Sequence, residues 1–324
     1  MSALHLLVRL VALVALTLSP IAHAQPYPAR PIRLIVPDAP GGSPDQLARL
    51  LAKALSESLG QQVFVDNRPG AAGVLATDTA AKAPPDGYTI AMTTTAIYAI
   101  LPNLKKDLPY DPVKDFIPVS RIATASNVLV VNVSLPAKSV AELIQYAKQR
   151  PGELNYASAG VGSPAHLAGE MLNLLAGIKL THIPYKGSAP ALLDVIAGNA
   201  QIMITSPIAA GAHMNNGRVR ALATTGTERN PALPDLPTVA ETVPGYEITQ
   251  SWGIAVPAGT PPAIVTRLAD EIGKAMRQPD VRDKVQATGA VPVGDSPQAF
   301  TAFMAKERQR LGDVIAKSGI VLND

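Results

Sequence analysis

The chain has 324 residues, with 28 Lys and Arg against 25 Asp and Glu, no cysteine, and only 16% charged residues. Globular chains usually carry about 25%. A net charge of +3 without a Lys/Arg-rich run excludes the electrostatic pattern of a nucleic-acid-binding protein. The absence of cysteine excludes a disulfide framework, a thiolate nucleophile and thiolate metal ligands. The length indicates two domains, each large enough for its own core.

The first 24 residues have the pattern of a secretory signal peptide. Arg9 precedes an apolar run at residues 10–18, and Ala-His-Ala at 22–24 forms a typical cleavage site. A membrane-spanning helix needs about 20 apolar residues, roughly twice this run. We therefore expect cleavage after Ala24, with an uncleaved N-terminal anchor as the alternative. The mature chain would begin at Gln25 and work in a bacterial periplasm, where NAD or ATP is not an expected cofactor.

Strand and helix patterns alternate along the first part of the chain. Residues 32–36 predict a buried strand, and apolar residues at helical spacing predict a helix over 44–59. We expect Ser43 as its N-cap, paired with Gln46 in a capping box, and Gly60 at its end. A strand at 63–65, a helix over 73–83 and a strand at 88–93 follow. This alternation predicts a parallel sheet with right-handed crossovers.

A second alternating series begins after an extended stretch at 127–132. We predict helices over 139–150, 163–176 and 188–197, the first with a capping box of Ser139 and Glu142, and strands at 154–158, 180–183, 200–204 and 219–225. After a proline-rich loop at 230–237 the chain extends through 248–256. It ends in helices over 261–276 and 297–318, which have no strands of their own and should pack on the first domain.

The predicted fold is α/β with two lobes, each a mainly parallel sheet flanked by helices. Residues 25–126 and 250–324 form the first lobe, and residues 127–249 form the second. Two extended crossings, near 127–132 and 250–256, join them.

A Gly-Ser-Pro corner occurs once in each predicted lobe, at residues 42–44 and 162–164. Each corner follows a buried strand and opens a helix, where glycine allows close approach and first-turn N–H groups carry partial positive charge. Ligands of parallel α/β sheets bind beyond the carboxyl ends of the strands. A good helix start explains either corner alone, but the repetition predicts a shared site for a small anion, bound by dipoles rather than by Lys or Arg.

Other polar residues are expected at the same edge of the sheets. They lie at 67–73, at the threonines 93–95, at 185–188 and at Thr205-Ser206. Asp45 lies in a first helical turn, where it most simply stabilises the helix dipole, and contact with a ligand amine is the alternative. A structural hydrogen-bonding role suits His166 better than ligand contact.

Sequence motifs of catalysis are poorly matched. Residues 160–165 fit the loose dinucleotide pattern, but Pro164 occupies the loop and no acidic residue ends the following strand. The sequence has no G-x-S-x-G elbow and no Walker A motif. The histidines at 166, 182 and 213 lack the spacing of a metal-binding helix. We therefore predict no catalytic residues, no cofactor and no metal site.

Seven short segments have the order and spacing of a known family. They are Tyr-Pro-Ala-Arg-Pro-Ile at 27–32, Pro-Gly-Gly-Ser-Pro-Asp at 40–45, Asn-Arg-Pro-Gly-Ala at 67–71, Ser-Ala-Gly-Val-Gly-Ser at 158–163 with His-Leu at 166–167, Pro-Tyr-Lys-Gly at 184–187, Leu-Pro-Thr-Val-Ala-Glu at 236–241, and Trp-Gly-Ile-Ala-Val-Pro-Ala-Gly-Thr-Pro at 252–261. Together they resemble the periplasmic solute-binding proteins of tripartite tricarboxylate transporters, also called the Bordetella uptake gene family. The resemblance covers residue 27 to the C-terminus.

This resemblance implies a periplasmic-binding-protein-like type II fold that closes by hinge motion on a small solute, usually a carboxylate. Carried over by motif position, the ligand-binding residues are Pro40, Gly41, Gly42, Ser43, Asp45, Ala71 and Thr94 on one wall, and Ser158, Gly160, Gly162, Ser163, Tyr185, Thr205 and Ser206 on the other. The chain departs from the family at Thr205-Ser206, where an acidic residue is expected, and at 93–95, where small residues are common. Lack of that acid favours a plain carboxylate over an ammonium-bearing ligand.

The resemblance therefore predicts an extracytoplasmic receptor that delivers a small carboxylate to membrane permease subunits. We expect it to be a monomer with no nucleic-acid partner. A secreted enzyme or a sensory ligand-binding protein on the same fold is the alternative. An enzyme would turn its ligand over, whereas a receptor would return it intact.

Overall fold

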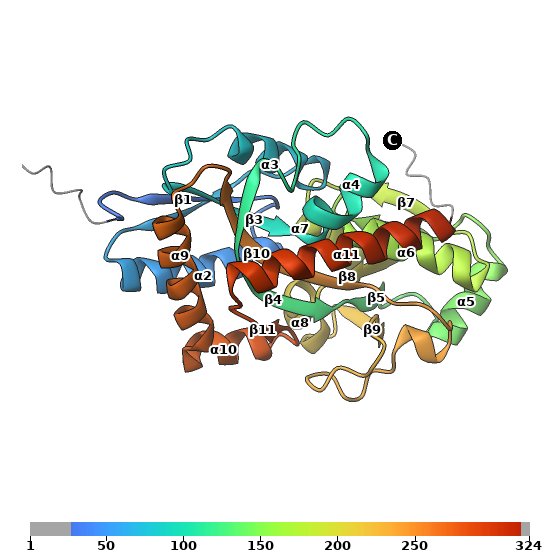
Figure 1. Ribbon diagram of the computed structural model, residues 1–324. Helices are drawn as coiled ribbons and strands as arrows, with labels where there is room; N and C mark the ends of the chain where they lie inside the picture. The colour runs from blue at the N-terminus through green and yellow to red at the C-terminus, as the bar shows by residue number, and fades with distance from the viewer. Residues whose placement is uncertain (1–26, 319–324) are drawn as a thin grey trace, which may run out of the picture.

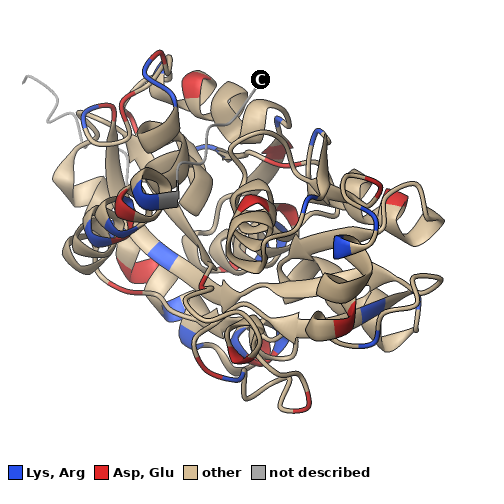
Figure 2. Ribbon diagram, turned by 90° about the vertical axis from the view of Figure 1, so that its right-hand side faces the viewer, with Lys and Arg blue, Asp and Glu red and all other residues tan. Residues whose placement is uncertain are grey.

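The computed structural model describes residues 27–318, which form two β-sheets flanked by helices (Figure 1). The predicted signal peptide and its cleavage site after Ala24 lie outside these residues. Lys and Arg are interspersed with Asp and Glu over the elements (Figure 2). None of the helices between residues 27 and 318 has the length and apolarity needed to cross a membrane.

The first sheet has six strands in the order β11-β4-β10-β3-β1-β2. These strands are β1 (Ile32–Val36), β2 (Val63–Asn67), β3 (Thr89–Thr94), β4 (Phe116–Ser126), β10 (Thr249–Pro257) and β11 (Val291–Pro292). β1, β2 and β3 are parallel, as predicted, whereas β10 is antiparallel to both of its neighbours, β3 and β4. The helices of this lobe are α2 (Ser43–Leu59), α3 (Val74–Ala81), α4 (Leu101–Leu104), α9 (Pro262–Arg277) and α10 (Pro279–Gln286), with short helical turns η1 (Ala71–Gly73) and η2 (Ala96–Ile100).

The second sheet has five strands in the order β7-β6-β8-β5-β9. They are β5 (Val128–Asn132), β6 (Asn155–Ser158), β7 (Thr181–Pro184), β8 (Ile202–Thr205) and β9 (Val219–Thr224). β6 is parallel to β7 and β8, whereas β5 is antiparallel to β8 and β9. The flanking helices are α5 (Val140–Lys148), α6 (Pro164–Ala176), α7 (Ser188–Ala197) and α8 (Pro207–Asn215), with a helical turn η3 (Val239–Glu241). We call each sheet with its helices a lobe.

Two extended crossings connect the lobes. The chain leaves the first sheet at the end of β4 and enters β5 after one residue, Asn127, and it returns from the second lobe into β10. β5 begins the second lobe, and β10 re-enters the first. Each of these two strands runs antiparallel to a neighbour in its own sheet. The sheets are therefore mixed, with their parallel strands next to one another.

The predicted capping box at the start of α2 is wrong. Gly42 is the N-cap, and Ser43 is already helical and makes no capping hydrogen bond. Its hydroxyl instead bonds Ser206 Oγ at 2.7 Å, while the Gln46 side-chain amide donates to the Gly41 carbonyl. A contact with the other lobe thus replaces the local cap. At α5 the Ser139 hydroxyl caps as predicted, but the Glu142 carboxylate accepts from the Lys138 N–H, one residue before the expected partner.

Several elements are absent from the sequence prediction. β4, α8, α10 and β11 were not expected, and the helix predicted from residue 73 begins only at Val74. Before it, Ala71 and Ala72 have φ values of 48° and 52°, a left-handed conformation that ends the preceding loop sharply. Pro118 and Arg121 interrupt the apolar pattern of β4, which hides this strand in the sequence.

The C-terminal helix α11 (Pro297–Ser318) also packs on the first lobe as predicted, against η2, β4 and α4. α9 lies against β4 and α2 of the first lobe, as predicted. The buried side chains of α11, including Phe300 and Leu311, belong to an apolar cluster that also contains Leu129 and Ile204 of the second sheet. Figure 1 shows α11 running across the molecule in front of both sheets. The helix therefore contributes to the apolar core that joins the lobes.

Gly253, in β10, tests the packing beneath α11. An added Cβ would lie 2.3 Å from Phe300 Cζ and 2.9 Å from the Ser120 carbonyl oxygen. We expect Gly253→Ala to lower the free energy of unfolding by about 1–3 kcal/mol through overpacking. Gly211→Ala is the matched control, because a Cβ there meets no atom within 4 Å. Because this position is helical, Gly211→Ala should raise the free energy of unfolding by up to about 1 kcal/mol. Urea unfolding followed by circular dichroism measures both, and equal effects would contradict the packing.

Candidate functional site: a cavity between the lobes

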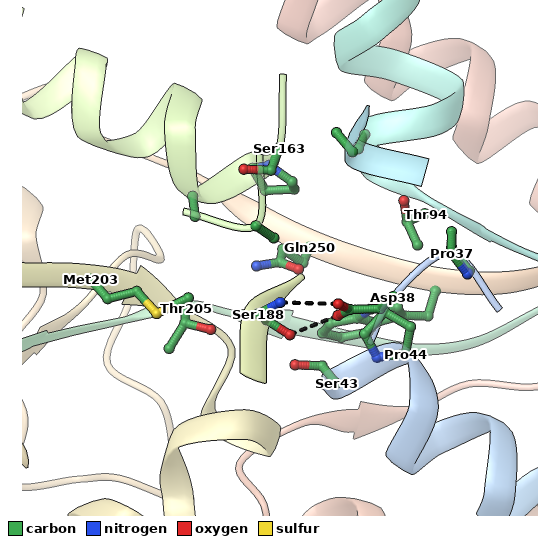
Figure 3. A pocket seen from close by; sticks show the side chains of 16 residues that line it. Pro37, Asp38, Ser43, Pro44, Thr94, Ser163, Ser188, Met203, Thr205 and Gln250 are labelled. Carbon is green, nitrogen blue, oxygen red and sulfur yellow. Dashed lines mark hydrogen bonds between the residues drawn. The ribbon is translucent and has the colours of Figure 1, made fainter. Parts of the chain in front are cut away.

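A cavity of about 60 Å³ lies between the two lobes (Figure 3). This is room for about two water molecules, since one water takes about 30 Å³ in the liquid. It is lined from the first lobe by Pro37, Asp38, Ser43, Pro44, Ala72, Thr94, Ala96, Gln250 and Trp252, and from the second by Ala159, Ser163, Pro164, Ala165, Ser188, Met203 and Thr205. A small solute fits this space, whereas a nucleotide or a peptide does not.

The N-termini of α2 and α6 meet at this cavity, as the two Gly-Ser-Pro corners predict. Ser43 lies in the first turn of α2, and Ala165 lies in the first turn of α6. Their N–H groups have no acceptor within their own helices, because the first four N–H groups of a helix have none. Both residues line the cavity, where the helix dipoles favour negative charge.

The polar groups of the lining are mostly uncharged. Thr94 and Thr205 supply hydroxyl groups from the ends of β3 and β8, and Gln250 supplies an amide. Among the described residues that line the cavity, Asp38 is the one ionisable side chain. An anion in this space would therefore be held by N–H and hydroxyl donors rather than by a basic side chain.

Four of the residues expected to bind ligand line the cavity. They are Ser43, Thr94, Ser163 and Thr205. The other ten, which do not line it, are Pro40, Gly41, Gly42, Asp45, Ala71, Ser158, Gly160, Gly162, Tyr185 and Ser206. Most of these lie in the loops and first turns around the cavity.

The Asp45 carboxylate is occupied within the first lobe. It accepts hydrogen bonds from the Gly41 N–H and the Asn67 side-chain amide, each at 2.9 Å, and pairs with Arg49 at 2.9 Å. Although burial acts in the opposite direction, the hydrogen bonds of Arg49, Gly41 and Asn67 lower the pKa of Asp45. Asp45 thus holds the loop before α2 in its shape. Tyr185 is similarly occupied, because its hydroxyl donates to Asp194 at 2.6 Å.

Glycines in the loops before α2 and α6 allow unusual backbone conformations and a close approach of the two lobes. Gly41, Gly160 and Gly162 have φ values of 84°, 122° and 83°, which L side chains rarely adopt. A Cβ on Gly42 would lie 2.4 Å from Asp38 Oδ2 and 2.6 Å from Ser188 Oγ. The backbones of the two lobes can approach each other here because this side chain is absent.

Asp38 was not predicted at the site, and Ser188 was expected at this edge of the sheets but not as a ligand-binding residue. Ser188 N and Oγ donate to the two oxygens of Asp38 at 3.0 and 2.7 Å, across the cleft (Figure 3). Burial raises the pKa of Asp38, and hydrogen bonds from Ser188 and Ala39 oppose this shift. With the bond between Ser43 and Ser206, these contacts hold the lobes together. Asp38 follows β1 by two residues, and its position after a strand was the signal that could have identified it.

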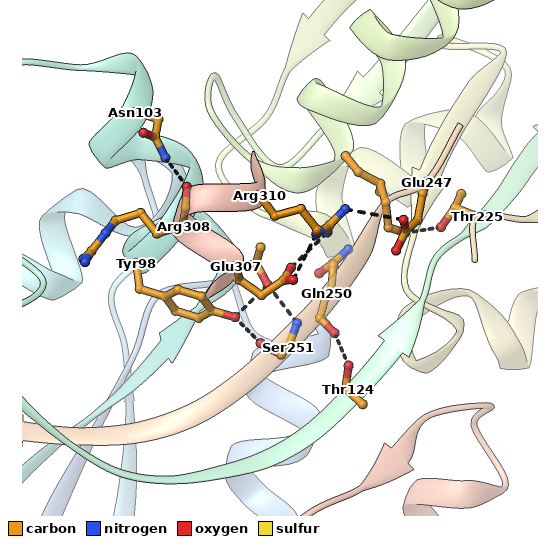
Figure 4. Close-up of polar contacts among 12 residues, drawn as sticks. Tyr98, Asn103, Thr124, Thr225, Glu247, Gln250, Ser251, Glu307, Arg308 and Arg310 are labelled. Atoms are coloured by element: carbon orange, nitrogen blue, oxygen red, sulfur yellow. Dashed lines mark hydrogen bonds and ion pairs between the residues drawn. The ribbon is translucent and has the colours of Figure 1, made fainter. Parts of the chain in front are cut away.

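Gln250 connects the cavity with the crossings (Figure 4). Its side-chain amide donates to the Asn127 side-chain oxygen, and its backbone carbonyl accepts from Thr124 Oγ1 at 3.0 Å. Nearby, the Asn127 N–H donates to Thr225 Oγ1 at 2.8 Å. Gln250 thus touches both the cavity and the point at which the chain passes between lobes, although it was not predicted as a site residue.

An ion-pair network lies beside this crossing. Arg310 of α11 pairs with Glu307 at 2.9 Å and with Glu247, which precedes β10, at 3.7 Å (Figure 4). The Tyr98 hydroxyl is hydrogen-bonded to Ser251 Oγ of β10. These bonds attach α11 and η2 to the returning crossing.

His166 and His182 stack beneath the loop at 158–163. Their ring centroids are 3.8 Å apart at an interplanar angle of 7°. Gly162 N–H donates to His166 Nδ1 at 3.2 Å, and Ser158 Oγ is hydrogen-bonded to His182 Nε2 at 2.6 Å. Ser158 is fully buried and outside the cavity lining, so this contact supports the loop. Between residues 27 and 318, no group of three or more His, Asp or Glu is arranged to hold a metal ion.

Two α/β lobes that enclose a small cavity at their helix N-termini define a two-lobed solute-binding protein. Residues 47–320 match the model of the tripartite tricarboxylate transporter family receptor. The chain belongs to this family of periplasmic solute-binding receptors. The family resemblance and the type II fold predicted from the sequence are confirmed.

Similar proteins cover nearly the whole chain. Protein BugT of Bordetella pertussis is 38% identical, with 97% of this chain and 98% of BugT aligned. The structure of R. palustris Rpa4515 with adipate is 41% identical, covers 91% of this chain and 99% of its own, and has a TM-score of 0.88. MatC (Rpa3494) of Rhodopseudomonas palustris with bound malate is 32% identical, with 89% and 100% coverage and a TM-score of 0.85.

The histidine pair predicts a loss of stability in mild acid. Burial lowers the pKa of His166 to about 3, with the neighbouring His182 adding to this effect, and burial lowers the pKa of His182 to about 4. In the unfolded chain both titrate near the ordinary value of about 6.5. The unfolded state therefore binds more protons below about pH 6.5, and stability falls as the pH falls from there towards about 4, by up to about 1.4 kcal/mol per pH unit for each histidine.

Urea unfolding between pH 7 and pH 5 measures this dependence. The double variant His166→Gln/His182→Gln should have a shallower slope than the natural protein, whatever its stability at pH 7. His213→Gln is the comparison from outside the stacked pair: burial and Arg218 also lower the pKa of His213, so this variant should flatten the slope only by the share of one histidine and leave that of the pair. Equal slopes for the natural protein and the double variant would contradict the assignment.

Proposed function

We propose that this protein captures a small carboxylate between its lobes in the periplasm and delivers it to the membrane permease subunits of a tripartite transporter. The cavity at the N-termini of α2 and α6 carries this proposal. Its donors are N–H groups and hydroxyls, which suit a carboxylate. Support also comes from two structural neighbours, whose structures contain adipate and malate.

The proposed capture step is a closure of two lobes, formed by residues 25–126 with 250–324 and by residues 127–249. The crossings at Asn127 and Gln250 act as the hinge, and the contacts of Asp38 with Ser188 and of Ser43 with Ser206 form on closure. A solute that binds the closed state more tightly shifts the equilibrium towards it. Release then requires a permease that favours the open state.

The predicted site residues divide into two proposed roles. Ser43, Thr94, Ser163 and Thr205 contact the solute, because they line the cavity. Pro40, Gly41, Gly42, Asp45, Ala71, Ser158, Gly160, Gly162, Tyr185 and Ser206 shape the surrounding loops and the closed interface. We further propose that the chain is cleaved after Ala24, acts as a monomer and returns its solute unchanged.

Binding of a carboxylate should raise the melting temperature. At a ligand concentration of 100 times Kd, the stabilisation is about 2.7 kcal/mol, which corresponds to a shift of several degrees. A panel of mono-, di- and tricarboxylates, amino acids and aromatic acids tests this by thermal unfolding. Mass spectrometry of the recovered solute distinguishes a receptor from an enzyme. If no compound moves the melting curve, or if the solute is recovered chemically changed, the proposal is wrong.

Thr205 tests whether the solute occupies this cavity. Thr205→Val keeps the shape of the side chain but removes its hydroxyl, so affinity for the active carboxylate should fall about three- to tenfold, the value of one hydrogen bond. Thr79→Val is the matched control, since the Thr79 hydroxyl bonds only the Leu75 carbonyl on α3. Calorimetric titration measures both variants. Equal affinities for Thr205→Val and the natural protein would place the solute elsewhere.

A further inference from the structure

Asp38 is a carboxylate in the wall of a cavity to which we assign a carboxylate ligand. It is 5% exposed, and it is the one ionisable side chain among the described residues of the lining. Its oxygens accept hydrogen bonds from Ala39 N, Ser188 N and Ser188 Oγ at 2.8, 3.0 and 2.7 Å. No Lys, Arg or His within residues 27–318 forms an ion pair with it. Burial raises the pKa of Asp38, and within the described part of the chain only these hydrogen bonds and the N-terminus of α7 act to stabilise its charged form.

The N-terminus of α7 is already occupied by this carboxylate. Ser188 is the first residue of α7, after the N-cap Gly187, and its N–H points to Asp38 Oδ1. A Cβ on Gly187 would lie 2.3 Å from that same oxygen, so the loop is shaped to admit the carboxylate. Asp38 thus caps a helix of the opposite lobe. The first N–H group of α7 is therefore bonded to Asp38, whereas Ser43 in the first turn of α2 and Ala165 in the first turn of α6 line the cavity.

A second negative charge beside Asp38 would be unfavourable. The cavity has room for few waters, and its lining provides no cation to share between two carboxylates. Like charges close together in a poorly hydrated space repel strongly and prevent both groups from being ionised. An uncharged donor or an ammonium group at the same place meets no such repulsion and can donate to the remaining acceptor capacity of Asp38.

We propose that Asp38 determines which carboxylates bind, by excluding solutes that place a second carboxylate next to the N-terminus of α7. The inference rests on the proposed function and narrows it. The preferred solutes carry one carboxylate, directed to α2 and α6, and an uncharged or ammonium group at the other end. Figure 3 shows Ser163 of the α6 corner and the bonded pair of Asp38 and Ser188 at separate places around the cavity.

Matched pairs of acids test this assignment. Calorimetric titration at pH 7.5 compares succinate with 4-hydroxybutyrate, and adipate with 6-hydroxyhexanoate and 6-aminohexanoate. The comparison is made in whichever series, of four or six carbons, binds more tightly. In that series the natural protein should bind the hydroxy or amino acid at least tenfold more tightly than the diacid. Asp38→Asn keeps an acceptor for Ser188 but removes the charge. It should shift the affinity ratio at least tenfold towards the diacid.

Ser188→Ala separates the charge of Asp38 from its contact across the cleft. It removes the hydroxyl bond and leaves the carboxylate, so affinity should fall for every acid while the ratio between diacid and hydroxy acid is kept. Melting curves establish that each variant is folded, and Asp38→Ser replaces Asp38→Asn if that variant is not. The ratio within one variant is unaffected by a uniform weakening of closure.

The possible failures are distinguishable. If the natural protein binds the diacid as tightly as its hydroxy partner, or if removal of the Asp38 charge leaves the ratio unchanged, this inference is wrong and the proposed carboxylate receptor stands. If no acid of either type binds the natural protein, the proposed function fails and the inference fails with it.

Discussion

Helix N-termini at the interface between the lobes are the constraint on which the rest of the structure depends. The first-turn N–H groups of α2, α6 and α7 have no acceptors in their own helices, and all three helices begin where the lobes meet. For α7 the acceptor comes from the opposite lobe, as Asp38. For α2 and α6 the N–H groups of Ser43 and Ala165 lie at the cavity wall. In the proposed function, a bound carboxylate supplies the acceptor for these two N–H groups.

The surrounding residues make this arrangement possible in a small space. Gly42 and Gly187 lack the side chains that would collide with Asp38, so the backbones of the two lobes come close enough for hydrogen bonds. Asp45 holds the loop before α2 from behind through its bonds to Gly41 and Asn67. Gln250 joins the cavity to the crossing at Asn127. The proposed solute site and the geometry of the lobes are therefore connected through few residues.

The sequence predicts the parallel strands, most helices and the two corners, because these follow from local periodicity and from glycine, serine and proline at helix starts. The sequence does not predict features that depend on contacts with the other lobe. Serine is a typical N-cap residue, but the Ser43 hydroxyl is hydrogen-bonded to Ser206 across the cleft. Asp38 and Gln250 are 212 residues apart in the chain and meet only through the fold. α11 packs on the first lobe as predicted, but its buried side chains also belong to a core shared by both lobes, which no pattern within the helix indicates.

The absence of cysteine allows a direct measurement of lobe closure. Spin labels on Lys53→Cys in α2 and Ala197→Cys in α7 would report the distance between the lobes, since both positions are exposed and each helix leads away from the cavity. Pulsed electron–electron double resonance should give a broad distribution centred on a longer distance without solute. Saturating carboxylate should replace it with a single shorter distance. The same distribution with and without a carboxylate that binds would contradict capture by closure.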